Sequence, residues 1–349
     1  MPGRRTIGVD MGGTKLLAGA VDTELSVYRR AQRSVSGLDQ SSLLDVVVEA
    51  VDEARESAGG EVVAVGIGIP ALIDQRIGRA VFSTHLPLAD VPFADIIAER
   101  LELPVFVDND SNLAALAEHR AGAARGASQA VVVTVGTGIG GGLILGGSLY
   151  RGAIGAAAEL GHVVIDMHGP PCQGNCHNHG CLEVLASGTA LAREAVRIAR
   201  ERTDSRLGRA LADGRELAGP LVTELAHDGD PAAIEAIELI GRRLGVGIAN
   251  FVNIFNPEVV VIGGGVIGAG ELLLAPARQE MLARALSPSR DEVRVVAARF
   301  GIEAGRLLSG VPELIRNSTS DRSSQNTIRP RTYRITRLTV KRSRQPRDP

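Results

Sequence analysis

The chain has 349 residues, of which 44% are hydrophobic and 22% are charged, and its formal net charge is −2. This length favours two domains, and the composition supplies enough aliphatic side chains for a core in each. No apolar run is long enough for a transmembrane helix or a secretory signal, and three cysteines do not make a disulfide framework. We therefore expect a cytoplasmic protein with no membrane partner.

The first third of the chain alternates predicted strands and helices. Helical periodicity predicts a first helix over 41–60, with Ser41 or Ser42 as its N-cap and Gly59 as its stop. Apolar runs that end at glycine, proline or acidic residues predict strands over 6–22, which contains a glycine turn, and over 25–35, 61–70 and 104–110. Further helices are predicted over 94–103 and 112–122.

The rest of the chain partly repeats this order. Residues 129–150 again predict a strand, a glycine turn and a strand. Later elements are helices over 188–203 and 230–255, a strand, turn and helix over 257–282, and a strand over 292–300. Because a hairpin with a glycine turn occurs in each half, at 9–18 and 131–146, we expect a two-lobed α/β protein with a cleft between the lobes. The expected lobes span 1–118 and 119–316.

Residues 317–349 form a polar tail with nine Lys or Arg and two Asp. The tail has no apolar periodicity, which predicts a disordered extension. A nucleic-acid-binding arm is the alternative interpretation of its charge, but Tyr333 is the only aromatic residue of the tail that could stack on a base. Nucleic acid is therefore not an expected partner.

Three glycine turns, at 11–15, 136–142 and 263–270, each follow an apolar strand. Backbone amides in such turns can hold phosphate oxygens, although none of the three matches the Walker A pattern. The first turn adds Asp10, a carboxylate that can hold Mg²⁺ through water, and the side chains of Thr14 and Lys15. Two such hairpins could clamp a triphosphate from both lobes.

Dinucleotide binding is the competing interpretation of these turns, because two of them also fit the pattern G-x-G-x-x-G. The turn that starts at Gly136 is followed by a strand, where that pattern requires a helix. The turn that starts at Gly263 is followed by a helix, but the acids nearest the next strand, Asp291 and Glu292, come before it. Both contexts argue against a dinucleotide site.

Two segments carry candidate groups for chemistry and for sugar binding. The stretch VFVDNDSN puts Asp110 at the start of a helix, where the helix dipole keeps a carboxylate ionised and able to accept a proton in phosphoryl transfer. The alternative is that Asp110 or Ser111 only caps that helix. In AAAELGHVVID, Glu159 and His162 could divide the hydroxyls of a sugar between an acceptor and a donor. A core histidine beside a surface glutamate is the alternative there.

All three cysteines of the chain, Cys172, Cys176 and Cys181, fall within ten positions. A closed zinc site needs four ligands, and His162 can be the fourth, with His168, His177 and His179 as rivals. Four protein ligands leave no open position, so such a zinc ion is structural. A zinc-bound imidazole can aim its second nitrogen at a substrate, and the same loop places Glu183. Buried inert thiols are the alternative.

In this order the motifs DMGGTK, NDSN, GTGIGGG, ELGH, CHNHGCLE and VIGGGV resemble those of the ROK family of sugar kinases, in its bacterial glucokinase branch, over about residues 5–305. The resemblance implies an actin-like ATPase (ribonuclease H-like) α/β fold with an interlobe cleft. It also implies a phosphotransferase of EC class 2.7.1 that phosphorylates glucose with ATP and Mg²⁺. A homodimer or homotetramer is the expected assembly.

The resemblance assigns roles to residues of this chain. Asp110 is the implied general base, and the implied sugar contacts are Asn109, Glu159, His162, Glu183 and Thr84. The implied zinc ligands are His162, Cys172, Cys176 and Cys181. The implied nucleotide contacts are Asp10, Gly12, Gly13, Thr14, Lys15, Gly136, Thr137, Gly138, Gly140, Gly141, Gly263, Gly264 and Gly265.

Three departures from the family pattern bear on these expectations. The usual C-x-C is widened to C-x₃-C with His177 beside it, the usual Pro-Gly is Pro70-Ala71, and the chain after Arg306 departs from the usual closing helix. Alternative functions are an N-acetylmannosamine or N-acetylglucosamine kinase and a non-catalytic sugar-sensing ROK regulator. The sequence leaves open which hexose is used and whether ATP or polyphosphate is the donor.

Overall fold

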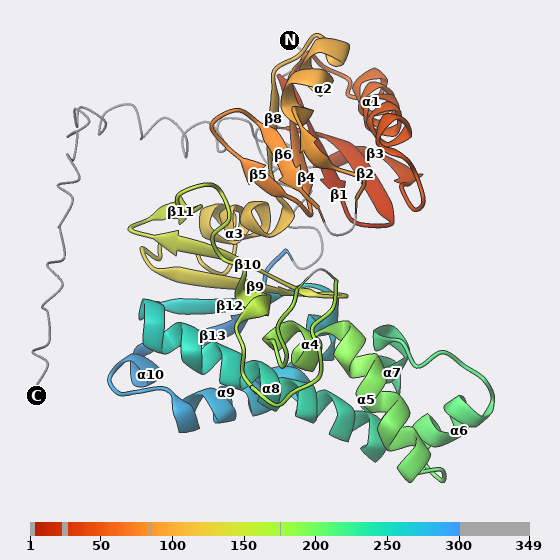
Figure 1. The fold of residues 1–349 in the computed structure, drawn as a ribbon, viewed down its shortest axis with the longest axis vertical. Coiled ribbons are helices and arrows are strands. Elements are labelled where there is room, and N and C mark those ends of the chain that lie inside the picture. The colour runs from red at the N-terminus through yellow and green to blue at the C-terminus, as the bar shows by residue number, and fades with distance from the viewer. Residues whose placement is uncertain (1–3, 23–26, 84–85, 175, 301–349) are drawn as a thin grey trace, which may run out of the picture.

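The computed structural model describes residues 4–22, 27–83, 86–174 and 176–300, and they form two α/β bodies (Figure 1). The side chain of Thr84 and the basic tail, both subjects of expectations above, lie outside these ranges. Within them, none of the helices combines the length and the apolar character needed to cross a membrane.

The first body is built on a five-stranded sheet with the order β3-β2-β1-β4-β8. β1 pairs antiparallel with β2, while β1, β4 and β8 are parallel to one another. The strands are β1 (Arg5–Met11), β2 (Lys15–Val21), β3 (Val27–Ser34), β4 (Val62–Ile69) and β8 (Val105–Asn109). The antiparallel β1–β2 pair confirms the hairpin with a glycine turn.

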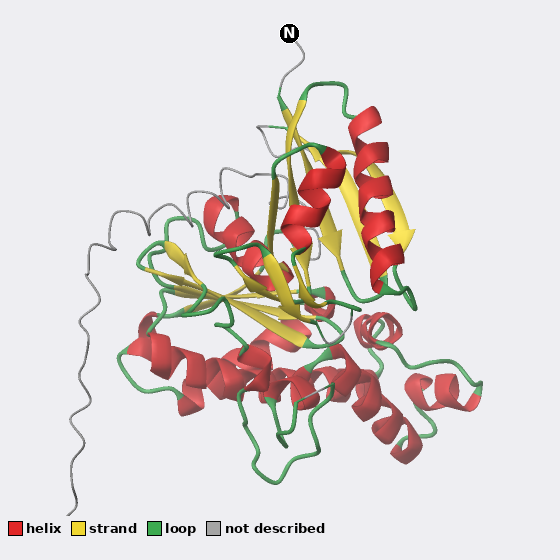
Figure 2. Ribbon diagram, turned by 45° about the horizontal axis from the view of Figure 1, so that its top comes forward, coloured by secondary structure: helices red, strands yellow, loops and turns green. Residues whose placement is uncertain are grey.

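Two helices cover this sheet, α1 (Gln40–Glu56) and α2 (Phe93–Leu101) (Figure 2). The N-cap of α1 is Asp39, whose carboxylate accepts a hydrogen bond from the amide of Ser42, so the expected cap at Ser41 or Ser42 is wrong. An aspartate at this position satisfies one of the first amides of the helix as a serine would, and it also adds a charge that the dipole favours.

A second, smaller sheet belongs to the first body and was not anticipated. It contains β5 (Leu72–Asp74), β6 (Arg79–Phe82) and β7 (Ala89–Val91), all antiparallel. Its strands have three or four residues each, too few for an alternating pattern to stand out. This sheet follows β4 directly and places Ala71 and Ile73 near the end of β8.

The second body repeats the topology of the first. Its sheet has the order β11-β10-β9-β12-β13, with an antiparallel β9–β10 hairpin and a parallel β9–β12–β13 part. The strands are β9 (Ala130–Val135), β10 (Ile139–Leu145), β11 (Ser148–Tyr150), β12 (Val259–Gly263) and β13 (Arg294–Ala297). The internal repeat expected from the two hairpins is therefore present in the strand order itself.

Both faces of the second sheet are covered, so every residue of β12 is buried. Val260 and Ile262 belong to the large core under the helices, whereas Val259 and Val261 face the core formed with α3 (Asp110–Ala121). The helices on the larger side are α4 (Leu182–Ala186), α5 (Gly188–Glu201), α6 (Arg206–Ala212), α7 (Gly219–His227), α8 (Pro231–Phe255), α9 (Glu271–Arg284) and α10 (Ser289–Glu292). Of these, α4, α6, α7 and α10 are short helices that the apolar pattern did not predict.

The helix α3 leaves the first sheet and packs on the second one (Figure 1). Its residues Leu113, Ala115 and Leu116 share a core with strands of the second sheet. The expected lobe boundary after residue 118 assigns α3 to the first lobe, whereas its packing associates it with the second. The junction between β8 and α3 is thus where the two bodies meet.

Candidate active site and metal centre

The candidate base lies at the junction of β8 and α3. Asp110 is the first residue of α3, and its carboxylate accepts a hydrogen bond from the amide of Ser111 at 2.9 Å. The N-cap is Asn109, whose Oδ1 accepts from the amides of Ser111 and Asn112 at 2.9 and 3.2 Å. Capping, the alternative role considered for Asp110, is therefore performed mainly by its neighbour. Asp110 extends from the positive end of a 12-residue helix, which favours its ionised form.

The other polar groups of the candidate sugar site come from two segments of the second body. Glu159 is the N-cap of the short 3₁₀ helix η1 (Leu160–His162) and His162 is its last residue, and the amide of His162 donates to the carbonyl of Glu159. Glu183 lies in the first turn of α4. Its Oε2 accepts from the amide of Ile139 at 2.8 Å, which ties this glutamate to the start of β10.

The charged groups of the candidate sugar site lie close enough to affect one another's pKa. The side chain of Glu159 is open to water, yet protein surrounds it closely enough for desolvation to raise its pKa above 4.5. His162 opposes this shift, whereas the charges of Glu183 and Asp110 add to it. Groups from α3, η1 and α4 therefore lie within interaction range of one carboxylate. Glu159 is thus an exposed residue, as the alternative interpretation has it, but its charged neighbours lie on α3 and α4 as well as on η1.

Each of the two hairpins of the phosphate motifs has a turn closed by a backbone hydrogen bond, and the turn of the first hairpin is one residue longer. The amide of Gly12 donates to the carbonyl of Lys15 at 2.8 Å, and the amide of Gly136 donates to the carbonyl of Gly138 at 2.9 Å. Asp10 lies at the end of β1, opposite Leu17. Thr14 and Lys15 are exposed. This arrangement offers the side chains expected for phosphate and Mg²⁺.

The glycines of the second and third turns have distinct environments. A Cβ on Gly138 would lie 2.3 Å from Oε2 of Glu183, so only glycine leaves room for that carboxylate. Gly264 has a φ of +86°, and a Cβ there would meet the carbonyl of Val135. Beside Gly136 and Gly265 the space is open, as a bound ligand requires. The remaining expected contacts are Gly13, Thr137, whose carbonyl accepts from Thr189 at 2.8 Å, and Gly263, the last residue of β12.

Gly140 and Gly141 differ from the other expected contacts because they lie inside β10, paired with Thr134 and Val133. A Cβ on Gly140 would lie 2.0 Å from Oγ of Ser111, and one on Gly141 would meet Leu160. These two glycines thus allow α3 and η1 to pack closely on β10. Their position favours a packing role over the expected phosphate contact.

The three thiols and His162 form one compact group. Their ligand atoms all lie within 4.8 Å of one another. Nδ1 of His162 is 3.6 Å from Sγ of Cys172, and Sγ of Cys176 is 3.9 Å from Sγ of Cys181. In a tetrahedral site with Zn–S bonds of about 2.3 Å and Zn–N bonds of about 2.0–2.1 Å, the ligand atoms are about 3.5–3.8 Å apart. The donor set and its spacing therefore fit a structural zinc ion.

The environment of the thiols agrees with a site for a cation. Burial, together with the neighbouring Cys181 and Cys176, raises the pKa of Cys172 to about 12. Thiols with such pKa values ionise only when a metal ion compensates the charge. The rival ligands His168, His177 and His179 are exposed and lie outside the compact group. Because Nδ1 of His162 faces the thiols, its Nε2 is the nitrogen that a sugar can use.

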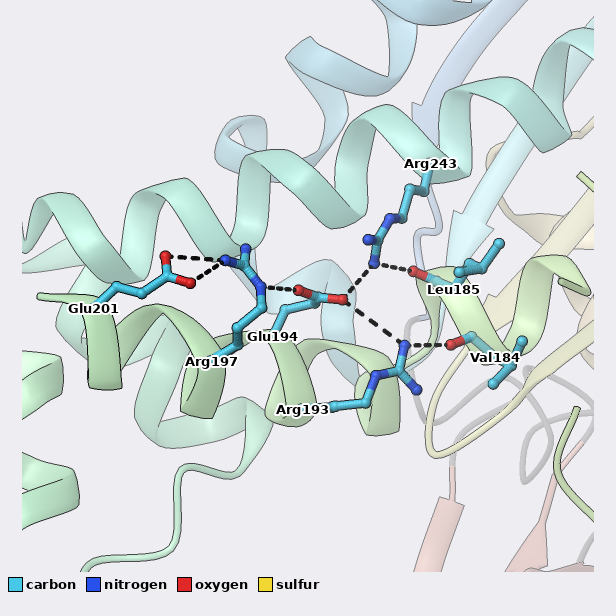
Figure 3. A network of polar contacts seen from close by, with 7 residues as sticks. All are labelled: Val184, Leu185, Arg193, Glu194, Arg197, Glu201 and Arg243. Carbon is cyan, nitrogen blue, oxygen red and sulfur yellow. Dashed lines mark hydrogen bonds and ion pairs between the residues drawn. The ribbon is translucent and has the colours of Figure 1, made fainter. Parts of the chain in front are cut away.

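A network of arginines, which the sequence did not reveal, holds α4 in place (Figure 3). Arg193 donates to the carbonyl of Val184 at 2.7 Å, and Arg243 donates to that of Leu185 at 3.2 Å. Both arginines also pair with Glu194 of α5. These contacts fix the end of the short helix that carries Glu183.

A buried ion pair that sequence analysis missed lies at the end of β8, beside the candidate base in the sequence. Asp108 precedes the Asn109–Asp110 segment, and it forms a buried ion pair with Arg151. The motif that carries Asp108 was recognised, but no pattern pointed to Arg151, which follows β11 far along the chain. Only the folded arrangement brings the two side chains together.

Comparison with known proteins identifies the family. The family model described as "ROK family" matches residues 6–314. A glucokinase from Streptomyces coelicolor is 35% identical over 319 residues, which cover 89% of this chain and 97% of that protein. The crystal structure of a ROK family glucokinase from Streptomyces griseus in complex with glucose and AMPPNP is 36% identical with a TM-score of 0.80, covering 90% of this chain and 99% of that one. The xylose repressor of Bacillus subtilis is 28% identical over 306 residues, covering 86% of this chain and 75% of the repressor. This chain therefore belongs to the ROK family and has its two-lobed actin-like ATPase fold.

Proposed function

We propose that the chain transfers the γ-phosphoryl group of ATP to the 6-hydroxyl of a hexose, with glucose as the expected substrate. The observation that carries the proposal is the grouping of Asp110, Glu183 and His162 around Glu159: the amide of His162 donates to the carbonyl of Glu159, and the charges of all three residues act on the Glu159 carboxylate. Three acceptors and an imidazole in one place suit a molecule with several hydroxyl groups. The likeness to glucokinases, one of them bound to glucose and AMPPNP, supports the same reaction.

In this proposal Asp110 is the general base. Its place at the start of α3 keeps it ionised, so it can accept the proton of the attacking hydroxyl as the phosphoryl group is transferred. Glu159 and Glu183 accept hydrogen bonds from other hydroxyls, and Nε2 of His162 donates one. These contacts orient the 6-hydroxyl toward the phosphate, and orientation supplies a large part of the rate in phosphoryl transfer.

The phosphate side of the proposed site consists of the two hairpin turns. In this proposal the triphosphate is held from the two bodies by the amides of Gly13 and Thr14 and by those of Thr137 and Gly138, because the amides of Gly12 and Gly136 donate within their turns. Lys15 adds a positive charge. Asp10 is the residue that would hold Mg²⁺ through water, and the ion supplies neutralisation of phosphate charge when it is bound. His162 and the three cysteines would hold a structural zinc ion, which would stabilise the wall of the sugar site without an open coordination position for chemistry.

The test is a coupled assay of ADP release by the purified full-length chain, with glucose, N-acetylglucosamine, N-acetylmannosamine and fructose. We expect the highest kcat/KM with glucose and ATP, and one zinc ion per chain by metal analysis of the same preparation. Asp110→Asn keeps the shape of the side chain but removes the base, so kcat is expected to fall about 10²–10⁴-fold while glucose still binds. Asp95→Asn makes the same change in the first turn of α2 and is the matched control.

Each other outcome contradicts a defined part of the proposal. A residual kcat of Asp110→Asn close to that of the wild type refutes its role as the base. Preference for an N-acetylated sugar or for polyphosphate replaces the substrate or the donor but retains the reaction. If all four sugars are left unphosphorylated with either donor, the chain is not a kinase of these sugars, and a binding role like that of the repressors in the family becomes the better explanation.

A further inference from the structure

The carboxylate of Asp108 is buried next to the segment that carries the proposed base, and it accepts the four hydrogen bonds described here. Its side chain is 1% exposed and that of Arg151 is 5% exposed. Oδ2 accepts from Nε and Nη2 of Arg151 at 2.9 and 2.5 Å. Oδ1 accepts from the amide of Asn109 at 2.8 Å and from Nδ2 of Asn112 at 3.0 Å. Oδ1 of Asp108 therefore accepts hydrogen bonds from the residue before Asp110 and from a residue after it.

This position gives Asp108 control over the direction in which Asp110 extends. The amide of Asn109 fixes the last peptide of β8, and Asn112 fixes the first turn of α3. Within the described part of the chain, Oδ1 of Asn112 has no hydrogen-bond partner, so Asp108 determines how that buried amide is turned. A change in the position of the Asp108 carboxylate therefore shifts both ends of the junction that carries the base.

Arg151 connects the same carboxylate to the second body. It follows β11 and begins the segment 151–158 that leads to Glu159. The amide of Ala157 donates to the carbonyl of Arg151 at 3.1 Å, which closes this segment into a compact loop. Gly155 of the loop lies so close to the first body that a Cβ there would be 2.0 Å from the carbonyl oxygen of Ile73.

We propose that the Asp108–Arg151 pair is a positioning device for phosphoryl transfer, which sets the base on α3 relative to the sugar contacts that follow the 151–158 loop. The inference rests on the proposed function, because it assigns Asp110 and Glu159 to the same substrate. The pair joins the last strand of one sheet to the edge strand of the other. It therefore fixes the distance between groups that belong to different bodies of the molecule.

A fully buried ion pair adds little to the free energy of unfolding, but it can fix the relative orientation of the two segments that carry it. Replacing such a pair by apolar side chains is often neutral for stability, but removing one partner leaves the other charge buried and uncompensated. The guanidinium of Arg151 donates from two nitrogens in a fixed plane, which defines an orientation that a lysine ammonium does not. A misplacement of about 1 Å at a reacting group can lower a rate about 10²-fold.

The test compares Asp108→Asn, Arg151→Lys, Arg151→Met and the double variant Asp108→Asn/Arg151→Met in the sugar kinase assay. We expect kcat to fall about 10²-fold in each single variant, with KM for ATP unchanged. Arg151→Lys keeps the positive charge, so a loss of kcat in this variant is due to the lost orientation of the guanidinium and not to a lost charge. The double variant is expected to be no slower than the worse single variant, because the two residues act as one unit.

Leu207→Ala is the control for lost stability. Leu207 is fully buried in α6, far from β8 and α3, so its truncation lowers the melting temperature without touching the site (Figure 1). All variants are assayed at a temperature at which circular dichroism shows them folded. Variants of the pair that keep the wild-type kcat while melting earlier, as Leu207→Ala is expected to do, overturn the positioning role and leave the proposed function standing. A wild type that phosphorylates none of the sugars overturns both.

Discussion

At the scale of single residues, Asn109 shows how one side chain is divided between folding and binding. Its Oδ1 accepts from two amides of α3, and its Nδ2 donates to the carbonyl of Ala71 at 3.4 Å. The oxygen is thus committed to the cap. A sugar contact from Asn109, which the sequence predicted, must therefore come from the amide nitrogen as a donor.

This division can be tested with a pair of variants. Asn109→Ser retains an oxygen that can cap α3 but loses the amide donor, whereas Asn109→Ala loses both. We expect Asn109→Ser to raise the KM for the hexose with little change in the free energy of unfolding. Asn109→Ala is expected to lower that free energy further, by about 1 kcal/mol for the lost cap. Urea unfolding and steady-state kinetics on both variants make the measurement. A wild-type KM in Asn109→Ser would remove Asn109 from the sugar site.

At the scale of elements, the sequence predicted best those segments whose own pattern decides their structure. The hairpins at 9–18 and 131–146 and the long helix α8 follow from alternating or helical apolar patterns and from glycine turns. The small β5–β7 sheet could not be predicted, because strands of three or four residues have no measurable period. The cap at Asp39 was missed because serines and aspartate are almost equally good N-caps.

Contacts between elements that are distant in the sequence could not be predicted for a different reason. Residues in short motifs, such as Glu159, His162 and the three cysteines, were found because their spacing limits the chemistry they can do. Arg151 contacts Asp108 from 43 positions away, and Glu194 joins its neighbours Arg193 and Arg197 to the distant Arg243. Nothing in the local sequence of Arg151 or Glu194 points to these distant partners. The candidate site was thus predictable where it is built from motifs and unpredictable where it is built from packing.

The helix α4 illustrates such packing, since Glu194 of the neighbouring α5 holds it through two arginines (Figure 3). With five residues, α4 is too short to be stable alone, and the arginines satisfy carbonyls at its end. Burial acts to raise the pKa of Glu194, but hydrogen bonds from Arg197 and Arg243 outweigh it and lower the pKa below 4.5. The charged form of Glu194 is therefore the form that stabilises this corner of the second body.

Glu194→Gln is predicted to be less stable than the wild type by about 1–3 kcal/mol at neutral pH, the usual loss for a hydrogen-bonded charge. Because the folded-state pKa is lowered, the stabilisation is complete above 4.5 and disappears as the pH falls through the lower folded-state value. The gap between the two unfolding free energies should therefore close in acid. Urea titrations from pH 7 to pH 3 measure this gap in unfolding free energy.

Glu201→Gln alters only the exposed end of the network and is the matched control. A gap that persists unchanged at pH 3 would contradict the assigned charge state.

At the scale of the whole molecule, α3 connects everything that the proposed reaction requires. It starts at the end of the first sheet, carries the base, and packs on the second sheet. Its last turn also reaches the end of the described chain, because the buried carboxylate of Glu118 accepts from the amides of Ala123, Arg299 and Phe300 at 2.7, 3.1 and 2.9 Å. The helix α3 is therefore one connection between the two sheets, in addition to the Asp108–Arg151 ion pair.

Glu118→Gln tests how much the contacts of the Glu118 carboxylate contribute to stability. Glu118 is 1% exposed and accepts three backbone donors, whereas glutamine offers one oxygen and places an amide against donors. We predict a loss of about 1–3 kcal/mol in the free energy of unfolding, and faster hydrogen exchange at the amides of Arg299 and Phe300. Glu99→Gln removes the same charge from an exposed site on α2, so it controls for charge alone. Because a shared helix transmits disorder at one end to the elements packed on it, exchange should also rise in β13, which ends just before Arg299. If Glu118→Gln matches Glu99→Gln in both stability and exchange, the carboxylate of Glu118 does not hold the segment after β13 against α3.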